Sequence, residues 1–121
     1  MNNFDTDYFI AKFSPIPDDQ WTTGEFVNDN GARCALGHCG CGRRLWQDRD
    51  GESKPEEPDA LRFLFHVAGA PAVTAINDNK PHIMTYFSDN ERAEISSCKT
   101  PKARVLLALN WIKAGRTWEQ E

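Results

Sequence analysis

The chain has 121 residues, of which 40% are hydrophobic and 26% charged; this is typical of one globular domain and argues against wholesale disorder. Its net charge of −4 is opposite to the basic excess of most nucleic-acid binders, so nucleic acid is disfavoured as a partner. Residues 1–5 lack the basic and apolar runs of a secretory signal, and no segment has the length of a membrane span. We therefore expect a cytoplasmic protein with no membrane partner, whose four cysteines are reduced thiols or metal ligands.

The N-terminal third begins with a predicted helix over residues 3–13, in which aromatic side chains recur four residues apart. Two prolines within residues 14–17 end this helix, because proline cannot continue it. Residues 21–27 are rich in aromatic and β-branched side chains and are predicted to be extended, with a turn over 28–31. Residues 32–39 fit a returning strand or a short helix. We favour a helix that is capped by the preceding Asn and Asp residues and ended by a glycine at 40 or 42.

The second half contains two well-marked helices. Residues 43–58 are polar and include two prolines, so we expect a surface loop. Residues 59–68 place apolar side chains at i, i+3, i+4 and i+7, as an amphipathic helix does, and Gly69 ends them. Residues 101–114 form the other helix, which Thr100 caps.

The segment between these helices is ambiguous, because 72–76 fits a short helix or a strand and 83–87 fits a strand. After the last helix, residues 115–121 are expected to be a frayed tail, from which Trp118 can still fold back.

The expected fold class is α+β but mainly α, in a small single domain that spans residues 1–121. It has three principal helices, over 3–13, 59–68 and 101–114, and a short β element from 21–27 and 83–87. We expect the helices to bury residues 34–39.

Residues 34–42 are the most distinctive segment, because they hold three of the four cysteines, a histidine and three glycines. Zinc is one interpretation, and its candidate ligands are Cys34, His38, Cys39 and Cys41. A structural zinc site needs four ligands, usually in two close pairs, and the second pair is missing here. A single residue from elsewhere would have to complete the site, the choices being Cys98, His66 and His82.

A thiol nucleophile is the second interpretation. Cys34 follows a turn, and a helix that starts there would lower the pKa of its thiol. The base would be His38, four residues further on, or His66 or His82. Asn77 or Asp78 would then orient the imidazole.

Packing is the third interpretation, because cysteine often behaves as a small buried hydrophobe. The small residues of 32–37 would then pack closely beneath the helices, and His38 would bond a nearby carbonyl or carboxylate. We favour this interpretation. It leaves no confident catalytic residue, metal ligand or cofactor-binding residue.

Four short motifs resemble a group of small uncharacterised proteins of bacteria and their phages or prophages. They are Ile16-Pro17-x-x-x-Trp21-x-x-Gly24, Arg33-Cys34-Ala35-Leu36-Gly37-His38, Ile76-Asn77-Asp78 and Thr100-Pro101-Lys102-x-Arg104-Val105-Leu106-x-Ala108-Leu109. The resemblance covers most of the chain and implies a bacterial or phage cytosolic setting, but it carries no activity.

The expected function is non-catalytic. Small size, acidic balance and the missing catalytic constellation favour an interaction protein of phage or mobile-element type, one that binds and inhibits a host protein. The alternatives are an enzyme that uses Cys34 with a histidine and a small zinc-binding domain. The sequence leaves the oligomeric state open.

Overall fold

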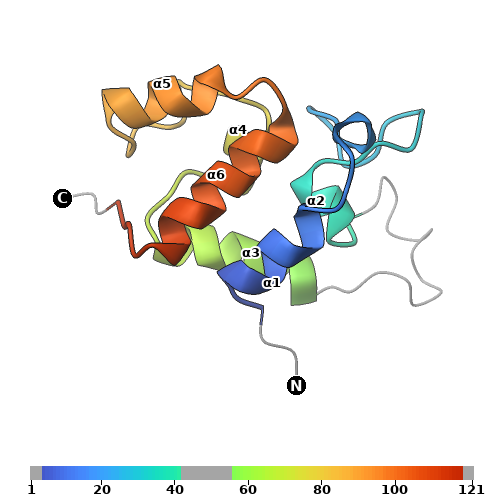
Figure 1. Cartoon of the computed structure of the whole chain (residues 1–121), viewed down its shortest axis with the longest axis horizontal. Helices are drawn as coiled ribbons and strands as arrows, with labels where there is room; N and C mark the ends of the chain where they lie inside the picture. Colours follow the sequence, from blue (N-terminus) through green and yellow to red (C-terminus); the bar gives the residue numbers. More distant parts are fainter. Residues whose placement is uncertain (1–3, 42–55, 119–121) are drawn as a thin grey trace.

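The computed structural model places six α-helices in the residues that it describes, which are 4–41 and 56–118 (Figure 1). These helices are α1 (Thr6–Phe13), α2 (Ala35–His38), α3 (Glu56–Val67), α4 (Val73–Asn77), α5 (Asp89–Ser97) and α6 (Pro101–Lys113), and a 3-10 helix, η1 (Asp18–Gln20), follows α1. Within the described ranges, pairing of β type is limited to isolated bridges from Arg33 to Trp21 and to Val27. The domain is therefore mainly helical, and the expected β element is reduced to these two bridges.

Residues 83–87 form successive turns, so the predicted strand is wrong there. The amide of Met84 donates to the carbonyl of Pro81, and the amide of Phe87 donates to the carbonyl of Met84. Met84 and Phe87, three residues apart, are buried, whereas Ile83 and Tyr86 are exposed. The spacing of the buried residues is that of turns, which the short apolar run hid because it also suits a strand.

Helices α1 and α6 pack against each other, although they lie near opposite ends of the chain. Helix α1 starts three residues later than predicted, because Asp5 is its N-cap and accepts the amide hydrogen of Tyr8. Phe9 and Phe13 stack with ring centroids 6.0 Å apart. At the start of α6, the Thr100 hydroxyl accepts the amide hydrogen of Ala103, as the sequence predicts.

Helix α3 begins at Glu56, so the surface loop predicted over 43–58 is wrong for its last three residues, and residues 42–55 lie outside the described ones. The buried carboxylate of Glu57 ties α3 to α1, because it accepts a hydrogen bond from the Tyr8 hydroxyl and lies 3.4 Å from Lys12 Nζ. At the other end, Gly69 adopts a φ of +74°, which confirms its predicted role in ending the helix.

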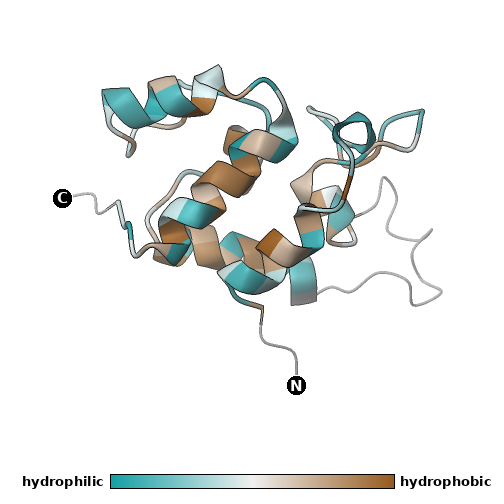
Figure 2. Cartoon of the chain, in the orientation of Figure 1, coloured by the Kyte–Doolittle hydropathy of each residue, from teal (hydrophilic) through white to brown (hydrophobic). Residues whose placement is uncertain are grey.

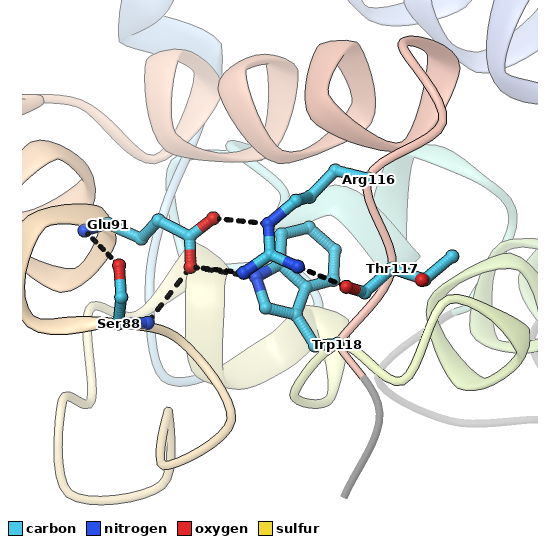
Figure 3. A network of polar contacts seen from close by, with 5 residues as sticks. All are labelled: Ser88, Glu91, Arg116, Thr117 and Trp118. Atoms are coloured by element: carbon cyan, nitrogen blue, oxygen red, sulfur yellow. Dashed lines mark hydrogen bonds and ion pairs between the residues drawn. The ribbon is translucent and has the colours of Figure 1, made fainter.

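Helix α5 is held together with the C-terminal segment by one carboxylate (Figure 3). Glu91 and Ser88 form a capping box, in which the Ser88 hydroxyl accepts the Glu91 amide hydrogen and Glu91 Oε1 accepts the Ser88 amide hydrogen. Arg116 Nε donates to Glu91 Oε2 at 2.8 Å, and Trp118 Nε1 donates to Glu91 Oε1 at 2.8 Å. Trp118 is buried, so it folds back as the sequence allows, and Arg116 is held by Glu91; the predicted frayed tail is therefore wrong at Arg116, and 119–121 lie outside the described residues.

The core lies around α6, which carries a long apolar stretch, whereas α5 is largely hydrophilic (Figure 2). Helices α2 and α4 both contact α6. Cys34, Leu36 and Cys39 are buried in the same cluster as the aromatic residues of α1, so the helices bury the cysteine segment as expected. None of the helices in the described ranges is both long and apolar enough to span a bilayer.

A candidate binding pocket at Cys34 and Asp78

The cysteine segment follows a tight turn that starts at Asn28. Asn28 Oδ1 accepts the amide hydrogens of Asn30 and Ala32, both at 2.9 Å, and Gly31 adopts a φ of +87°. These contacts confirm the predicted turn over 28–31. The predicted helix also forms, but it covers only Ala35–His38, and its N-cap is Cys34 instead of an Asn or Asp residue.

Gly37 lets the preceding loop lie directly on α2. A Cβ atom at this position would be 2.1 Å from the Phe26 carbonyl oxygen, which is far inside van der Waals contact. The same oxygen accepts the amide hydrogen of Cys34 at 3.2 Å. The glycine is therefore required for close approach of two backbone segments.

The buried side chain of Asn77 joins three segments of the chain. Its Oδ1 accepts the amide hydrogen of Ala35 at 3.1 Å, and its Nδ2 donates to the Thr22 carbonyl at 3.0 Å and to Asp78 Oδ1 at 2.8 Å. Asn77 is 1% exposed, so these bonds replace water for groups that could not otherwise be satisfied. The structure thus brings the candidate residues Cys34 and Asn77 together at the start of α2.

Asp78 lies beside Asn77 and is bound to the loop after Trp21. Its Oδ1 accepts the amide hydrogen of Gly24 at 3.1 Å as well as that of Asn77 Nδ2. Gly24 adopts a φ of +82°, a conformation that glycine adopts without strain. Two bonds to one oxygen hold the Asp78 carboxylate in place.

A surface pocket of about 380 Å³ opens next to this carboxylate. Its walls come from residues 24–27 together with Cys34, Thr74 and Asp78. Two of the sequence candidates, Cys34 and Asp78, therefore share a pocket with Glu25 and Phe26. Glu25 and Thr74 were not predicted to belong to a site, because they come from an irregular loop and from a helix far apart in the sequence.

The Cys34 thiol is neutral in this environment. Burial raises its pKa, the backbone amides of Gly37 and Leu36 oppose the rise, and the charge of Asp78 adds to it. The net shift is upward, so little thiolate is present at neutral pH. This is the opposite of the shift that a cysteine nucleophile needs.

His38 is engaged away from the pocket. Its Nε2 lies 3.1 Å from the Gln20 carbonyl oxygen, and its ring centroid is 4.6 Å from that of Trp21. Burial lowers the pKa of His38 to about 4, although the Gln20 carbonyl acts in the other direction. The imidazole is therefore neutral at pH 7 and donates to that carbonyl. This is a hydrogen bond to a carbonyl of the kind that the packing interpretation predicts.

The other two histidines lie outside this pocket. His66 is exposed on α3 and lines a second cavity, of about 340 Å³, together with Arg62 and Val73. His82 is exposed in the turns before α5. Across 4–41 and 56–118, the structure shows no hydrogen bond between a histidine and the Cys34 thiol.

The four zinc candidates differ in their surroundings. Cys34 and Cys39 are buried, and burial raises the pKa of Cys39 to about 12. Cys41 is partly exposed, with Arg62 Nη2 3.9 Å from its sulfur, and the His38 ring is turned to Gln20. Of the proposed fourth ligands, Cys98 donates to the Glu94 carbonyl at 3.6 Å. The described part of the chain contains no group of three His, Cys, Asp or Glu side chains placed to hold a metal ion.

Arg104 binds the backbone at the end of α4, next to the pocket residue Asp78, and was not predicted to do so. It is 7% exposed, its Nε donates to the Ile76 carbonyl at 3.1 Å, and its Nη2 donates to the Asn77 carbonyl at 2.7 Å. Its Nη1 donates to the Cys98 carbonyl at 2.9 Å. The sequence signal that could have predicted this role is the position of the arginine among apolar residues of the last helix, because a charged residue that faces a core needs polar partners.

The fold and the site together define a small helical domain with a surface pocket of mixed acidic and apolar character. No protein-family model, curated protein or solved structure matches this chain.

Proposed function

We propose that the protein is a non-catalytic interaction protein that acts by binding another protein. The observation that carries this proposal is an apolar pair on the outer face of α3: Phe63 is 64% exposed and Val67 is 62% exposed. The two side chains are four residues apart and therefore lie on successive turns of one helix face.

This face is not needed for the packing of α3 within the domain. The opposite side of this segment packs into the core through Leu61, Phe65 and Ala68, which are buried there. Single exposed apolar residues are ordinary, but neighbouring ones often mark an interaction surface. Burial of each large side chain on a partner would contribute about 1.5–3 kcal/mol.

The surface continues beyond α3. Val67 and Tyr86 line a common cavity of about 400 Å³, whose floor includes the buried Trp118. Tyr86 is 40% exposed. Aromatic side chains at the edge of a hollow are typical anchors of protein interfaces.

The neutral thiol of Cys34 supports binding over catalysis. A cysteine nucleophile needs a thiolate or an adjacent base, and the contacts described above supply neither. We therefore place the enzyme and the zinc domain behind an interaction protein of phage or mobile-element type. Such a protein would act in the cytoplasm of a bacterial or phage-infected cell and inhibit the protein that it binds.

The test is affinity capture from a bacterial lysate with three forms of the chain. They are the wild type, the double variant Phe63→Glu with Val67→Lys, and the control Ile83→Glu, which removes an exposed apolar side chain elsewhere. We expect a stoichiometric partner with the wild type and the control, and its loss with the double variant. A partner that all three forms retain equally would contradict the assignment to α3.

A second outcome would favour the enzyme. If no stoichiometric partner is captured and a measurable turnover is lost in Cys34→Ser, the non-catalytic proposal is wrong. Circular dichroism of every variant shows whether the fold is retained, so that loss of binding is not mistaken for loss of structure.

A further inference from the structure

The pocket at Asp78 combines negative charge with apolar walls. Asp78 and Glu25 are the ionisable carboxylates of its lining, and no lysine, arginine or histidine lines it in the described residues. Arg104, a buried cation whose charge interacts with that of Asp78, donates to the carbonyls of Ile76, Asn77 and Cys98 and does not line the pocket. An anionic ligand would meet the like charge of Asp78 here, whereas a cation would meet an opposite one.

The Asp78 carboxylate is oriented before any ligand arrives. The Gly24 amide and Asn77 Nδ2 both donate to Oδ1. The other oxygen, Oδ2, has no hydrogen bond from the described residues. A carboxylate held in this way loses little conformational freedom on binding, which favours affinity.

The remaining lining determines what kind of cation fits. Phe26 and Val27 give the pocket apolar walls, and Phe26 is 36% exposed. Cys34 is 4% exposed and neutral, so it adds a compact and weakly polar surface. A volume of about 380 Å³ accommodates a small organic group or one long side chain.

A bare metal ion fits this lining poorly. Glu25, Cys34 and Asp78 line the pocket, but no three His, Cys, Asp or Glu side chains of the described residues are placed to hold one ion, and apolar walls offer nothing to a hydrated ion. An alkyl group, by contrast, would cover Phe26 and Val27 while its charged end reached Asp78. The pocket can therefore hold both the apolar part and the charged end of one ligand.

The geometry points to a binding site for an organic cation on an apolar stem, an alkylguanidinium or alkylammonium group, whose charge pairs with Asp78 and whose stem lies against Phe26 and Val27. The ligand is either a free small molecule or a Lys or Arg side chain of another protein. This site is separate from the α3 face and does not rest on the function proposed above.

The first experiment titrates butylguanidinium into the ¹⁵N-labelled wild-type chain at constant ionic strength, because salt screens exposed charges. Butylurea serves as the neutral probe of nearly the same shape. We expect a saturable shift of the Gly24 and Asp78 amide signals with butylguanidinium and at least a tenfold weaker response to butylurea. Equal responses to both, or no saturable shift at these amides, would overturn the proposal.

The second experiment removes the charges one at a time. Asp78→Asn keeps an oxygen that can accept from Gly24 and Asn77, and we expect it to weaken butylguanidinium binding about tenfold, as the loss of a charge-assisted hydrogen bond does. Glu25→Gln should weaken it less, because Glu25 is exposed. The control Asp18→Asn removes an exposed carboxylate outside the pocket and should change the affinity less than twofold. An equal effect of Asp18→Asn and Asp78→Asn would contradict a specific pairing with Asp78.

A third experiment separates the two sources of the ligand. A short peptide with one arginine is compared with its citrulline counterpart and with butylguanidinium. Binding of the arginine peptide at least as tight as that of butylguanidinium indicates a side chain of a partner, and binding of butylguanidinium alone indicates a small molecule. Equal binding of the arginine and citrulline peptides would count against the cation site. If Asp78→Asn fails to fold, the comparison of charged and neutral probes on the wild type still decides.

Discussion

Replacement of Asn77 by alanine tests whether this one side chain holds α2, α4 and the loop at Thr22 together. The substitution removes the partners of the Ala35 amide and the Thr22 carbonyl, and both bonds lie in buried or partly buried surroundings. Each orphaned group costs about 1–3 kcal/mol, and the lost volume adds to this. We therefore expect the free energy of unfolding to fall by about 3–5 kcal/mol.

The assay is urea unfolding followed by circular dichroism. With a slope of about 2 kcal/mol per molar urea, a loss of 4 kcal/mol moves the midpoint by about 2 M. The matched control is Asn110→Ala. Asn110 is exposed and donates only to the Leu106 carbonyl within its own helix, so its replacement should change stability by less than about 0.5 kcal/mol.

Asn77→Asp sharpens the test, because it keeps the oxygen for the Ala35 amide and removes only the donor. At neutral pH its carboxylate would face the Thr22 carbonyl and Asp78, so the pKa of the introduced carboxyl would be raised. A carboxyl whose pKa is higher in the folded than in the unfolded state makes the protein less stable as the pH rises from the unfolded-state pKa through the folded-state pKa. The variant should therefore approach the wild type as the pH falls towards about 4.

Two results would refute this reasoning. One is a loss of less than about 1 kcal/mol in Asn77→Ala, which would mean that no buried group had been orphaned. The other is an Asn77→Asp variant as stable as the wild type at pH 7.

Three further substitutions test other contacts. Gly37→Ala should destabilise the domain by about 2–3 kcal/mol in urea unfolding, because its Cβ would be 2.1 Å from the Phe26 carbonyl oxygen; unchanged stability would contradict that approach. Burial raises the pKa of Glu91, but hydrogen bonds, chiefly from Arg116, outweigh it and hold the pKa below its ordinary value. The ionised Glu91 carboxylate therefore stabilises the fold above its unfolded-state pKa of about 4.3, and this stabilisation is lost as the pH falls further. Glu91→Gln should cost about 1–2 kcal/mol of unfolding free energy at pH 7 and little in acid. A stability difference between the variant and the wild type that does not change with pH would contradict this. Arg104→Lys should cost about 2–4 kcal/mol in thermal unfolding, because an ammonium cannot reproduce the bonds of the guanidinium to three carbonyls, and a variant within 1 kcal/mol would show that those bonds contribute little.

The elements with local signals are the ones that the sequence predicts well. Helix α6 needed only Thr100 and the apolar stripe that follows it, and Gly69 marked the end of α3. Helix α5 has the same kind of signal, a capping box from Ser88 to Glu91, yet it was missed. The reason is that Ile95 is the one residue of α5 that is buried, so the helix lacks the apolar periodicity on which the prediction relied.

The C-terminal segment shows why composition misleads at chain ends. Residues 115–117 carry small and polar side chains and residues 119–121 are polar, which predicts fraying, although Trp118 between them can fold back. The partner that holds Trp118 and Arg116 is Glu91, about twenty-five residues earlier, on the helix that was missed. An error in one element therefore produced an error in another.

The candidate site divides in the same way. Residue type alone singled out Cys34, Asn77 and Asp78, but no local pattern places Asn77 against an amide 42 residues away. His38 was proposed as a base because it follows Cys34 by four residues, which is the spacing of one helix face. Its imidazole instead meets the Gln20 carbonyl, a backbone group whose position depends on η1 and on the bridge from Trp21 to Arg33.

The position of Cys34 follows from this arrangement of backbone contacts. Its amide bonds the Phe26 carbonyl, and the next residue bonds Asn77, so the thiol is fixed between a loop and α4. Burial next to Asp78 keeps it protonated and therefore a poor nucleophile. The same carboxylate that disfavours the thiolate would stabilise a bound cation. Burial is thus the main reason that thiol catalysis is disfavoured at this pocket, and the Asp78 charge adds to it while favouring the cation proposed to bind there.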